Sequence, residues 1–101
     1  MILVRDVFQA KFGKVDELVA LFKTMLAEAP ADMPAAFRNA RILVDASGPF
    51  FTAVMETEFE SMAQWEAAFA QMMSMQGPGD PTNRMYDLVR SGYREFFRIE
   101  R

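Results

Sequence analysis

"SGPFFTAVMETEF", from Ser47 to Phe59, is the stretch of sequence that decides the fold. It begins with the turn residues "SGP" and continues with aromatic, β-branched and threonine residues, which is typical of a β-strand. Because alternate residues of a strand point to opposite faces, one face carries no charge and consists of Phe51, Ala53, Met55, Thr57 and Phe59. The other face mixes apolar side chains with two carboxylates, in Phe50, Thr52, Val54, Glu56 and Glu58. We therefore expect helices to cover the uncharged face and to leave the mixed face open.

The sequence before this stretch predicts a strand, a helix and a second strand. Residues 2–9, "ILVRDVFQ", are rich in β-branched and aromatic residues, with one charge on each face. Apolar residues recur at helical spacing from Val15 to Leu26, and Pro30 stops this helix. Residues 30–38 form a loop with two prolines, and the next strand is expected over residues 39–46.

The sequence after the quoted stretch predicts a second long helix, a short helix and a last strand. Ser61 opens a capping box of the form S-x-x-Q, and apolar residues follow it at helical spacing. Asp80, which precedes a proline, caps the short helix, and Gly92 is expected to end it. Residues 93–100, "YREFFRIE", form the last strand.

The order strand, helix, strand, strand, helix, strand is that of a ferredoxin-like α+β domain, which we expect to fill residues 1–101 as a single domain. The predicted antiparallel sheet has the strand order 4-1-3-2. Right-handed crossovers place both long helices on the same face of this sheet. The opposite face is therefore left without a cover.

The composition of the 101 residues is that of a globular protein, since 51% are apolar and 25% are charged. A domain of this size buries only a limited share of its surface, so an oligomer is expected. The charged residues are interspersed, and their net charge of −3 argues against a nucleic-acid partner. We recognise no signal peptide and no membrane-spanning segment, and we expect a cytoplasmic protein without a membrane partner.

The chain contains no cysteine and no histidine. Disulfides, thiolate nucleophiles and a histidine general base are thereby excluded, and proton transfer is left to Asp, Glu, Lys or Tyr. Asp45, Glu56 and Glu58 offer oxygen ligands for a hard cation, but their spacing is not diagnostic of a metal site. We expect neither a metal nor a cofactor.

The mixed face of the sheet indicates a partner. A sheet face that meets only water is largely polar, yet Phe50 and Val54 lie beside the two glutamates on this face. Leu43 and Phe96 are expected to join them from neighbouring strands. Two copies of the chain that meet through these faces would enclose a barrel-like interior. The expected partner is therefore a second copy, in a homodimer.

Four charged residues are candidates for ligand binding in this interior: Arg41, Asp45, Glu56 and Arg94. An arginine can hold an anion and a carboxylate can move a proton, so the expected ligand is a small apolar or anionic molecule. The same residues have a structural alternative, because Arg and Glu on adjacent strands form cross-strand ion pairs. No residue is assigned a catalytic role.

Two longer segments, "AKFGKVDELVALFKTM" and "SGPFFTAVMETEFESMAQWEAAF", resemble the dimeric α/β barrel superfamily, and in particular its NIPSNAP-like and antibiotic-biosynthesis-monooxygenase-like members. The resemblance is carried by Gly13 and Lys14, by the acidic end of the quoted strand, and by a capped Ser61 helix that contains Trp65. It implies a homodimer whose two sheets form one barrel, with a small-molecule pocket between each sheet and its own helices or loops. Haem-using branches are disfavoured, because no histidine can serve as an axial ligand.

Two hypotheses about function remain open. In the first, the protein is a cofactor-independent enzyme similar to oxygenases or isomerases of this superfamily. In the second, it is a non-catalytic ligand-binding or regulatory dimer of the same fold. In the second hypothesis the connections at residues 30–38 and 75–84 can close over the mouth of a pocket, and their alternative, which the sequence favours, is that of ordinary connectors.

Overall fold

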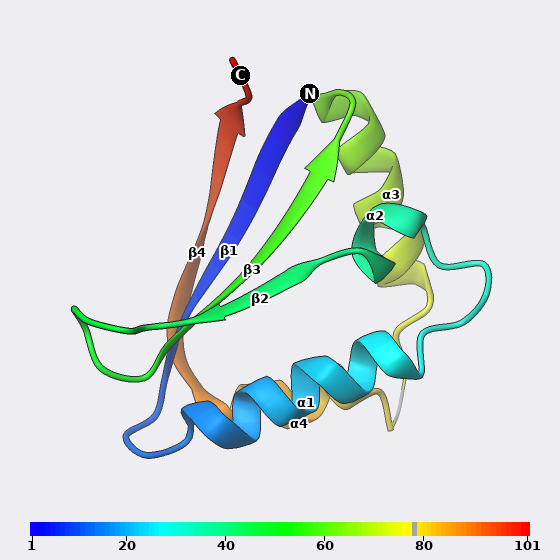
Figure 1. Ribbon diagram of the computed structural model, residues 1–101. Helices are drawn as coiled ribbons and strands as arrows, with labels where there is room; N and C mark the ends of the chain where they lie inside the picture. The colour runs from blue at the N-terminus through cyan, green and yellow to red at the C-terminus, as the bar shows by residue number, and fades with distance from the viewer. Residues whose placement is uncertain (78) are drawn as a thin grey trace.

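The computed structural model describes residues 1–77 and 79–101, and it contains one four-stranded antiparallel sheet with helices on one side (Figure 1). In chain order the elements are β1 (Ile2–Ala10), α1 (Val15–Ala27), α2 (Ala35–Arg38), β2 (Arg41–Val44), β3 (Thr52–Phe59), α3 (Met62–Ser74), α4 (Pro81–Leu88) and β4 (Val89–Arg98). The strand order β2-β3-β1-β4 is the predicted 4-1-3-2 order read from the other edge, so the ferredoxin-like fold is confirmed. None of the helices in the described residues is long and apolar enough to cross a membrane.

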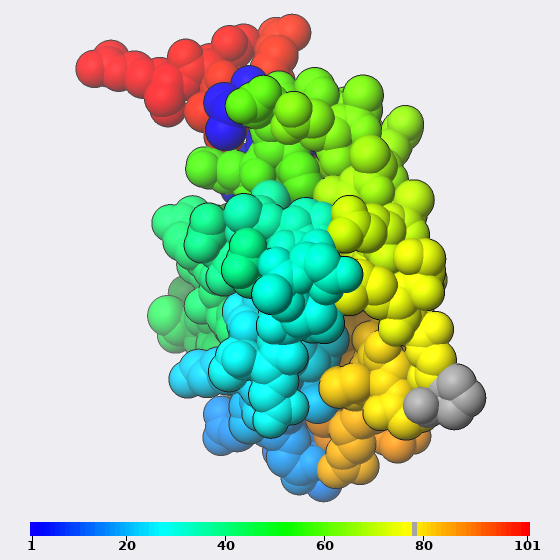
Figure 2. Space-filling model, turned by 90° about the vertical axis from the view of Figure 1, so that its right-hand side faces the viewer, coloured from blue at the N-terminus to red at the C-terminus, as the bar shows by residue number. Residues whose placement is uncertain are grey.

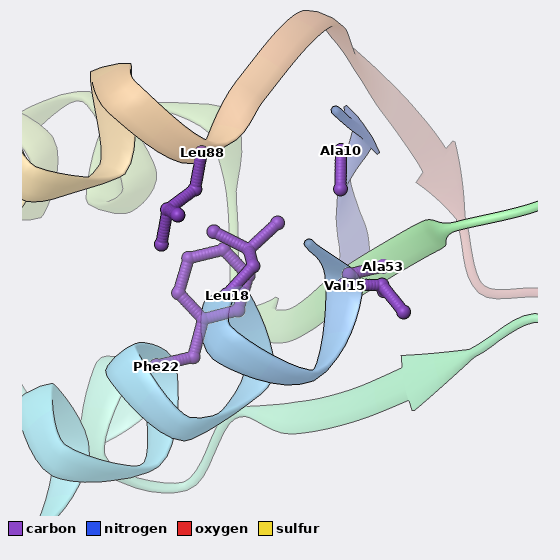
Figure 3. Packing of buried hydrophobic residues seen from close by; sticks show 6 residues of the cluster. All are labelled: Ala10, Val15, Leu18, Phe22, Ala53 and Leu88. Carbon is purple, nitrogen blue, oxygen red and sulfur yellow. The ribbon is translucent and has the colours of Figure 1, made fainter. Parts of the chain in front are cut away.

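The core lies between the sheet and the helices, as the uncharged face of β3 predicts. One cluster joins α1, α4, β1 and β3, and Figure 3 shows its side chains pointing toward one another, with the Phe22 ring near Leu18. A second cluster surrounds Val4 and Phe59 at the other end of the sheet, where Ala68 of α3 packs on them. Apolar side chains removed from water in this way supply most of the stabilisation of a small domain.

The ends of the helices follow the capping residues in the sequence. The Ser61 hydroxyl accepts a hydrogen bond of 3.2 Å from the backbone N–H of Gln64 at the start of α3. Asp80 Oδ1 accepts one of 2.7 Å from the backbone N–H of Thr82 at the start of α4. Both predicted N-caps are confirmed, and each satisfies a backbone donor that the first turn of a helix leaves unpaired.

Several boundaries differ from the prediction. Residues 30–38, expected as a loop, contain the short helix α2, and β2 covers only Arg41–Val44 of the expected residues 39–46. The quoted stretch becomes a strand only at Thr52, because Phe51 adopts a φ of 60° and turns the chain into the hairpin. The predicted connection 75–84 ends at α4, and Pro78 within it lies outside the described residues.

The prediction that Gly92 ends the short helix was wrong. α4 ends at Leu88 and passes directly into β4, which contains Gly92. In the sheet Gly92 lies opposite Phe8, whose ring occupies the space of the missing side chain. A Cβ at this position would lie 3.3 Å from Phe8 Cδ1 and 3.1 Å from the carbonyl oxygen of Val7. This glycine therefore serves close packing and not helix termination.

The register of the sheet assigns each residue to a face. β1 pairs Val4 with Phe96 and Leu3 with Phe97, so Phe96 lies on the helix side, where its ring meets Trp65 at 4.8 Å. The expectation that Phe96 lies on the open face was therefore wrong, and Phe97 takes that position. Leu43, opposite Val54, lies on the open face as predicted.

Gly92→Ala is expected to lower the free energy of unfolding by about 1–3 kcal/mol, because the backbone carbonyl of Val7 cannot move away from the added methyl group without disturbing the sheet. Urea unfolding followed by circular dichroism measures the change. Gly77→Ala is the matched control, since no atom of the described residues lies within 4 Å of its added Cβ, and it should change stability by less than about 0.5 kcal/mol. Equal effects of the two substitutions would contradict this packing at Gly92.

Candidate functional site

The four candidate ligand-binding residues are distributed over three places in the fold. Arg41 and Glu56 meet on the open face of the sheet, where they form an ion pair. Asp45 lies just beyond β2, at the hairpin that leads to β3. Arg94 lies on the opposite face, under the helices, because β4 places it opposite Asp6. The structure therefore brings together two of the four residues and separates the others.

A row of alternating charges crosses the open face. The register pairs Arg41 with Glu56, Glu56 with Arg5, and Arg5 with Glu95, so that one residue comes from each strand in the order β2, β3, β1 and β4. Glu56 Oε2 accepts a hydrogen bond of 3.0 Å from Arg5 Nε, and Glu56 Oε1 accepts one from Arg41 Nη2. Arg5 Nη1 reaches Glu95 Oε1 at 3.3 Å. Both oxygens of Glu56 are thus occupied by cations.

This row of charges explains how β3 can carry the carboxylate of Glu56 next to apolar side chains. The Glu56 side chain is only 10% exposed, and a carboxylate at that depth is costly unless cations pair with it. Two guanidinium groups supply that pairing from the adjacent strands. Glu56 therefore forms cross-strand ion pairs, which is the structural role considered for it beside ligand binding.

A cavity of about 410 Å³ lies beside the end of this row. It is lined by Met1, Leu3, Ala36, Asn39, Arg41, Glu56 and Glu58. Glu58 is exposed and lies opposite Leu3, and it has no ion-pair partner among the described residues. The two glutamates are therefore unlike each other, since Glu56 is buried and paired and Glu58 faces solvent.

Asp45 serves the hairpin between β2 and β3. Its Oδ1 accepts a hydrogen bond of 2.9 Å from the backbone N–H of Thr52, and its own N–H donates to the carbonyl of Thr52 at 3.0 Å. These two bonds close the loop that contains the positive φ of Phe51. Within residues 1–77 and 79–101 no three acidic residues converge as a metal site would require.

A second pair of charges lies on the helix side of the sheet. Arg94 Nε donates to Asp6 Oδ1 at 2.5 Å. The guanidinium carbon of Arg94 lies 5.1 Å from the centre of the Trp65 ring and 4.7 Å from that of Phe69, which is within the range of a cation–π interaction. The two aromatic residues are four positions apart on α3 and stack with their centres 5.1 Å apart. An arginine held by a carboxylate and by two rings has little freedom to change its orientation.

Sequence reasoning missed Asp6 as part of this site. The available signal was the position of Asp6 in residues 2–9, on the face that also carries the core residue Val4. A charge on the covered face of a central strand is costly unless it has a partner, so it marks a place where the interior is polar or open.

A cavity of about 470 Å³ adjoins Arg94 at the β4 edge, and we call it the helix-side cleft. It is lined by Asp6, Phe8, Met85, Tyr86, Val89, Arg90, Ser91, Gly92, Tyr93 and Arg94. Its aromatic and apolar groups are Phe8 of β1, Met85 and Tyr86 of α4, and Val89 and Tyr93 of β4. Two arginines and one aspartate are its charged groups, so the cleft has an excess of positive charge. Such a surface suits a small aromatic or planar anion.

Comparison with known proteins identifies the fold. No protein-family model matches the chain, and no curated protein matches it. An uncharacterized NIPSNAP domain protein from Burkholderia xenovorans superposes with a TM-score of 0.77 at 14% identity, over 98% of this chain and 94% of that one. Protein Atu4242 from Agrobacterium tumefaciens superposes with a TM-score of 0.84 at 14% identity, over 100% and 95% of the two chains.

A candidate antibiotic biosynthesis monooxygenase from Deinococcus radiodurans superposes with a TM-score of 0.68 at 13% identity, over 100% of this chain and 94% of that one. These structures confirm the resemblance to NIPSNAP-like and monooxygenase-like proteins as a likeness of fold. At such identities the shared feature is the path of the backbone, and a site has to be argued from its own residues.

Glu56→Gln is expected to lower the free energy of unfolding by about 1–3 kcal/mol, because the two arginines lose the carboxylate that they share at a largely buried position. Glu58→Gln, two residues along the same strand and face, should change stability by less than about 0.5 kcal/mol, since Glu58 is exposed. Chemical denaturation of both variants under identical conditions measures the difference. A similar loss in both would show that the row contributes nothing specific.

Proposed function

We propose that the chain is a single ferredoxin-like domain that forms a homodimer and binds a small planar anion in the helix-side cleft. The observation that carries the ligand is the position of Arg94, fixed by Asp6, Trp65 and Phe69 beside a cavity of about 470 Å³. The proposed interface of the homodimer is the open face of the sheet. The cytoplasmic location expected from the sequence is part of the same proposal.

The chemistry of Arg94 supports an anionic ligand. Its hydrogen bond to Asp6 uses Nε, and its terminal Nη groups have the planar fork geometry that pairs with a carboxylate or an enolate. Arg90 lines the same cleft and adds a second positive charge. Phe8 and Tyr86 provide aromatic surface beside these charges, which favours a ligand with a ring.

The open face supports the homodimer. Leu43, Tyr93 and Phe97 lie on it with exposed fractions of 40%, 62% and 45%. The solvated face of an antiparallel sheet is normally polar, so exposed large side chains on this face indicate a partner. The charges of Arg5 and Glu56 are already paired within the chain, so a partner that covers the face leaves neither of them without an opposite charge.

A cofactor-independent enzyme is the second candidate function, and Asp6 is the observation that favours it. Its carboxylate lies beside Arg94 in the cleft, so a C–H proton of a carbon acid can pass to Asp6 while the electron pair stays on the substrate as an enolate facing Arg94. Return of the proton to another carbon completes an isomerisation, and reaction of the carbanion with dioxygen begins an oxygenation. Candidate antibiotic biosynthesis monooxygenases from Deinococcus radiodurans and Chloroflexus aurantiacus share the fold, with TM-scores of 0.68 and 0.64.

An aromatic carboxylate such as 4-hydroxybenzoate is expected to bind and to change the fluorescence of Trp65, the only tryptophan of the chain. Arg94→Gln should weaken this binding by about 10- to 100-fold, which corresponds to the loss of a charge-assisted hydrogen bond. Arg98→Gln is the matched control, because Arg98 lies on the same face of β4 and pairs with Glu100 at the surface. Fluorescence titration and calorimetry measure both variants.

Equal binding by the two variants, or no binding by any of a panel of aromatic carboxylates at millimolar concentration, would overturn the proposed ligand site. Turnover of a bound carboxylate or quinone-like compound, lost in Asp6→Asn while binding persists, would select the enzyme over the non-catalytic protein.

Leu43→Asp is expected to raise the dissociation constant of the homodimer at least about 10-fold, because it places a charge on the apolar surface of the proposed interface. Val44→Asp is the control. Val44 is the next residue, is exposed to nearly the same extent (44% against 40%), and points to the other face. Sedimentation equilibrium measures both. A wild-type chain that stays at its monomer mass of 11.5 kDa at micromolar concentration would refute the homodimer.

A further inference from the structure

A third cavity lies on the helix side, away from the cleft, where the two long connections of the chain meet. Residues 30–38 lie against the C-terminal part of α3 (Figure 2), and Gln71 Nε2 donates to the carbonyl oxygen of Asp32 at 2.8 Å. The cavity between them measures about 330 Å³. It is lined by Met25, Glu28, Ala29, Pro30, Met33, Met72, Met75, Gln76, Asp80, Pro81 and Thr82. None of the residues lining the helix-side cleft is among them.

Four methionines give this cavity, which we call the methionine pocket, its apolar character. Two come from α1 and the connection after it, and two come from the end of α3. All four are only half-buried, so each leaves apolar surface open to the pocket. A thioether side chain is flexible and polarisable, and it adapts to apolar ligands of irregular shape. Apolar side chains that surround an open volume of this size are typical of a ligand site.

The charge of the lining selects the head group of the ligand. Glu28 and Asp80 are its two charged residues, and neither Lys nor Arg is among the described residues that line it. Asp80 uses Oδ1 to cap α4 through the backbone N–H of Thr82. A carboxylate ligand would meet only like charge here, whereas an ammonium group would be attracted to both acidic residues.

We propose that the methionine pocket binds a primary aliphatic amine, with its alkyl chain among the methionines and its ammonium group between Glu28 and Asp80. The pocket shares no lining residue with the helix-side cleft, so it makes a second binding site of opposite charge preference. For both connections that contribute to it, the sequence left open whether they cover a pocket or only join neighbouring elements. Binding there would join α1, α3 and the start of α4.

The proposal is tested with octylammonium as the probe and with the methyl groups of the nine methionines as reporters. In ¹³C-methyl-methionine NMR spectra, octylammonium is expected to shift the signals of Met25, Met33, Met72 and Met75 in a saturable manner. Met73 is the local control, because it neighbours Met72 in α3 but does not line the pocket. Met85 lines the helix-side cleft, and a shift confined to Met85 would place the amine there and overturn the proposal.

Two comparison ligands separate the contribution of the alkyl chain of the ligand from that of its charge. Octanoate has the same chain with the opposite charge and should bind at least about 10-fold more weakly, and ethylammonium has the charge without the chain and should produce no saturable shift. Equal affinity for octylammonium and octanoate would overturn the choice of an amine. The absence of any saturable shift with octylammonium would overturn the site.

A double variant tests the two acidic residues without disturbing the helix. Asp80→Asn keeps a side chain that caps α4 nearly as well, and Glu28→Gln keeps the size of the other residue. The double variant is expected to lose the preference for octylammonium over octanoate while the circular dichroism spectrum stays unchanged. A preference that persists in the folded double variant would contradict the proposed position of the ammonium group.

Discussion

The arrangement of this sheet depends on Glu56, a nearly buried carboxylate held between Arg5 and Arg41. Its two cations come from the strands on either side, so the pairing is made only when β2, β3 and β1 are in this register. A slip of one residue would turn the carboxylate to the helix side and leave both arginines without it. The ion pairs therefore specify one alignment among those that the apolar residues would allow.

The same register produces a second pair of charges on the other face. Asp6 follows Arg5 in β1, and Arg94 precedes Glu95 in β4. The two strands therefore place a pair of opposite charges on each face of the sheet, Arg5 with Glu95 on the open face and Asp6 with Arg94 on the helix side. The two pairs have different surroundings. The outer row is satisfied within the sheet, which suits a surface covered by a partner. The inner pair adjoins a cavity and two aromatic rings, which suits recognition of a ligand.

The helices divide their side of the sheet into two regions of opposite charge. The cleft at the β4 edge is lined by Arg90 and Arg94, whereas the methionine pocket is lined by Glu28 and Asp80. α4 contributes to both, with Met85 and Tyr86 in the cleft and with its first residues at the pocket. A single short helix thus separates a surface suited to anions from one suited to cations, within a chain of 101 residues.

The order of the four strands and of helices α1, α3 and α4, the two N-caps, the covered face of β3 and the strand order could be predicted from the sequence, because alternation and capping are local properties of the chain. The face of each residue in β4 could not be predicted. In "YREFFRIE" both alternating sets contain aromatic and charged residues, so only the pairing of Val4 with Phe96 decides that Arg94 and Phe96 lie under the helices. The position of Gly92 beside Phe8 and the meeting of the two connections around the methionine pocket are likewise contacts between residues distant in the chain. Local patterns determined which elements form, and tertiary packing decided which charges meet, because a charge finds its partner only once the strands are aligned.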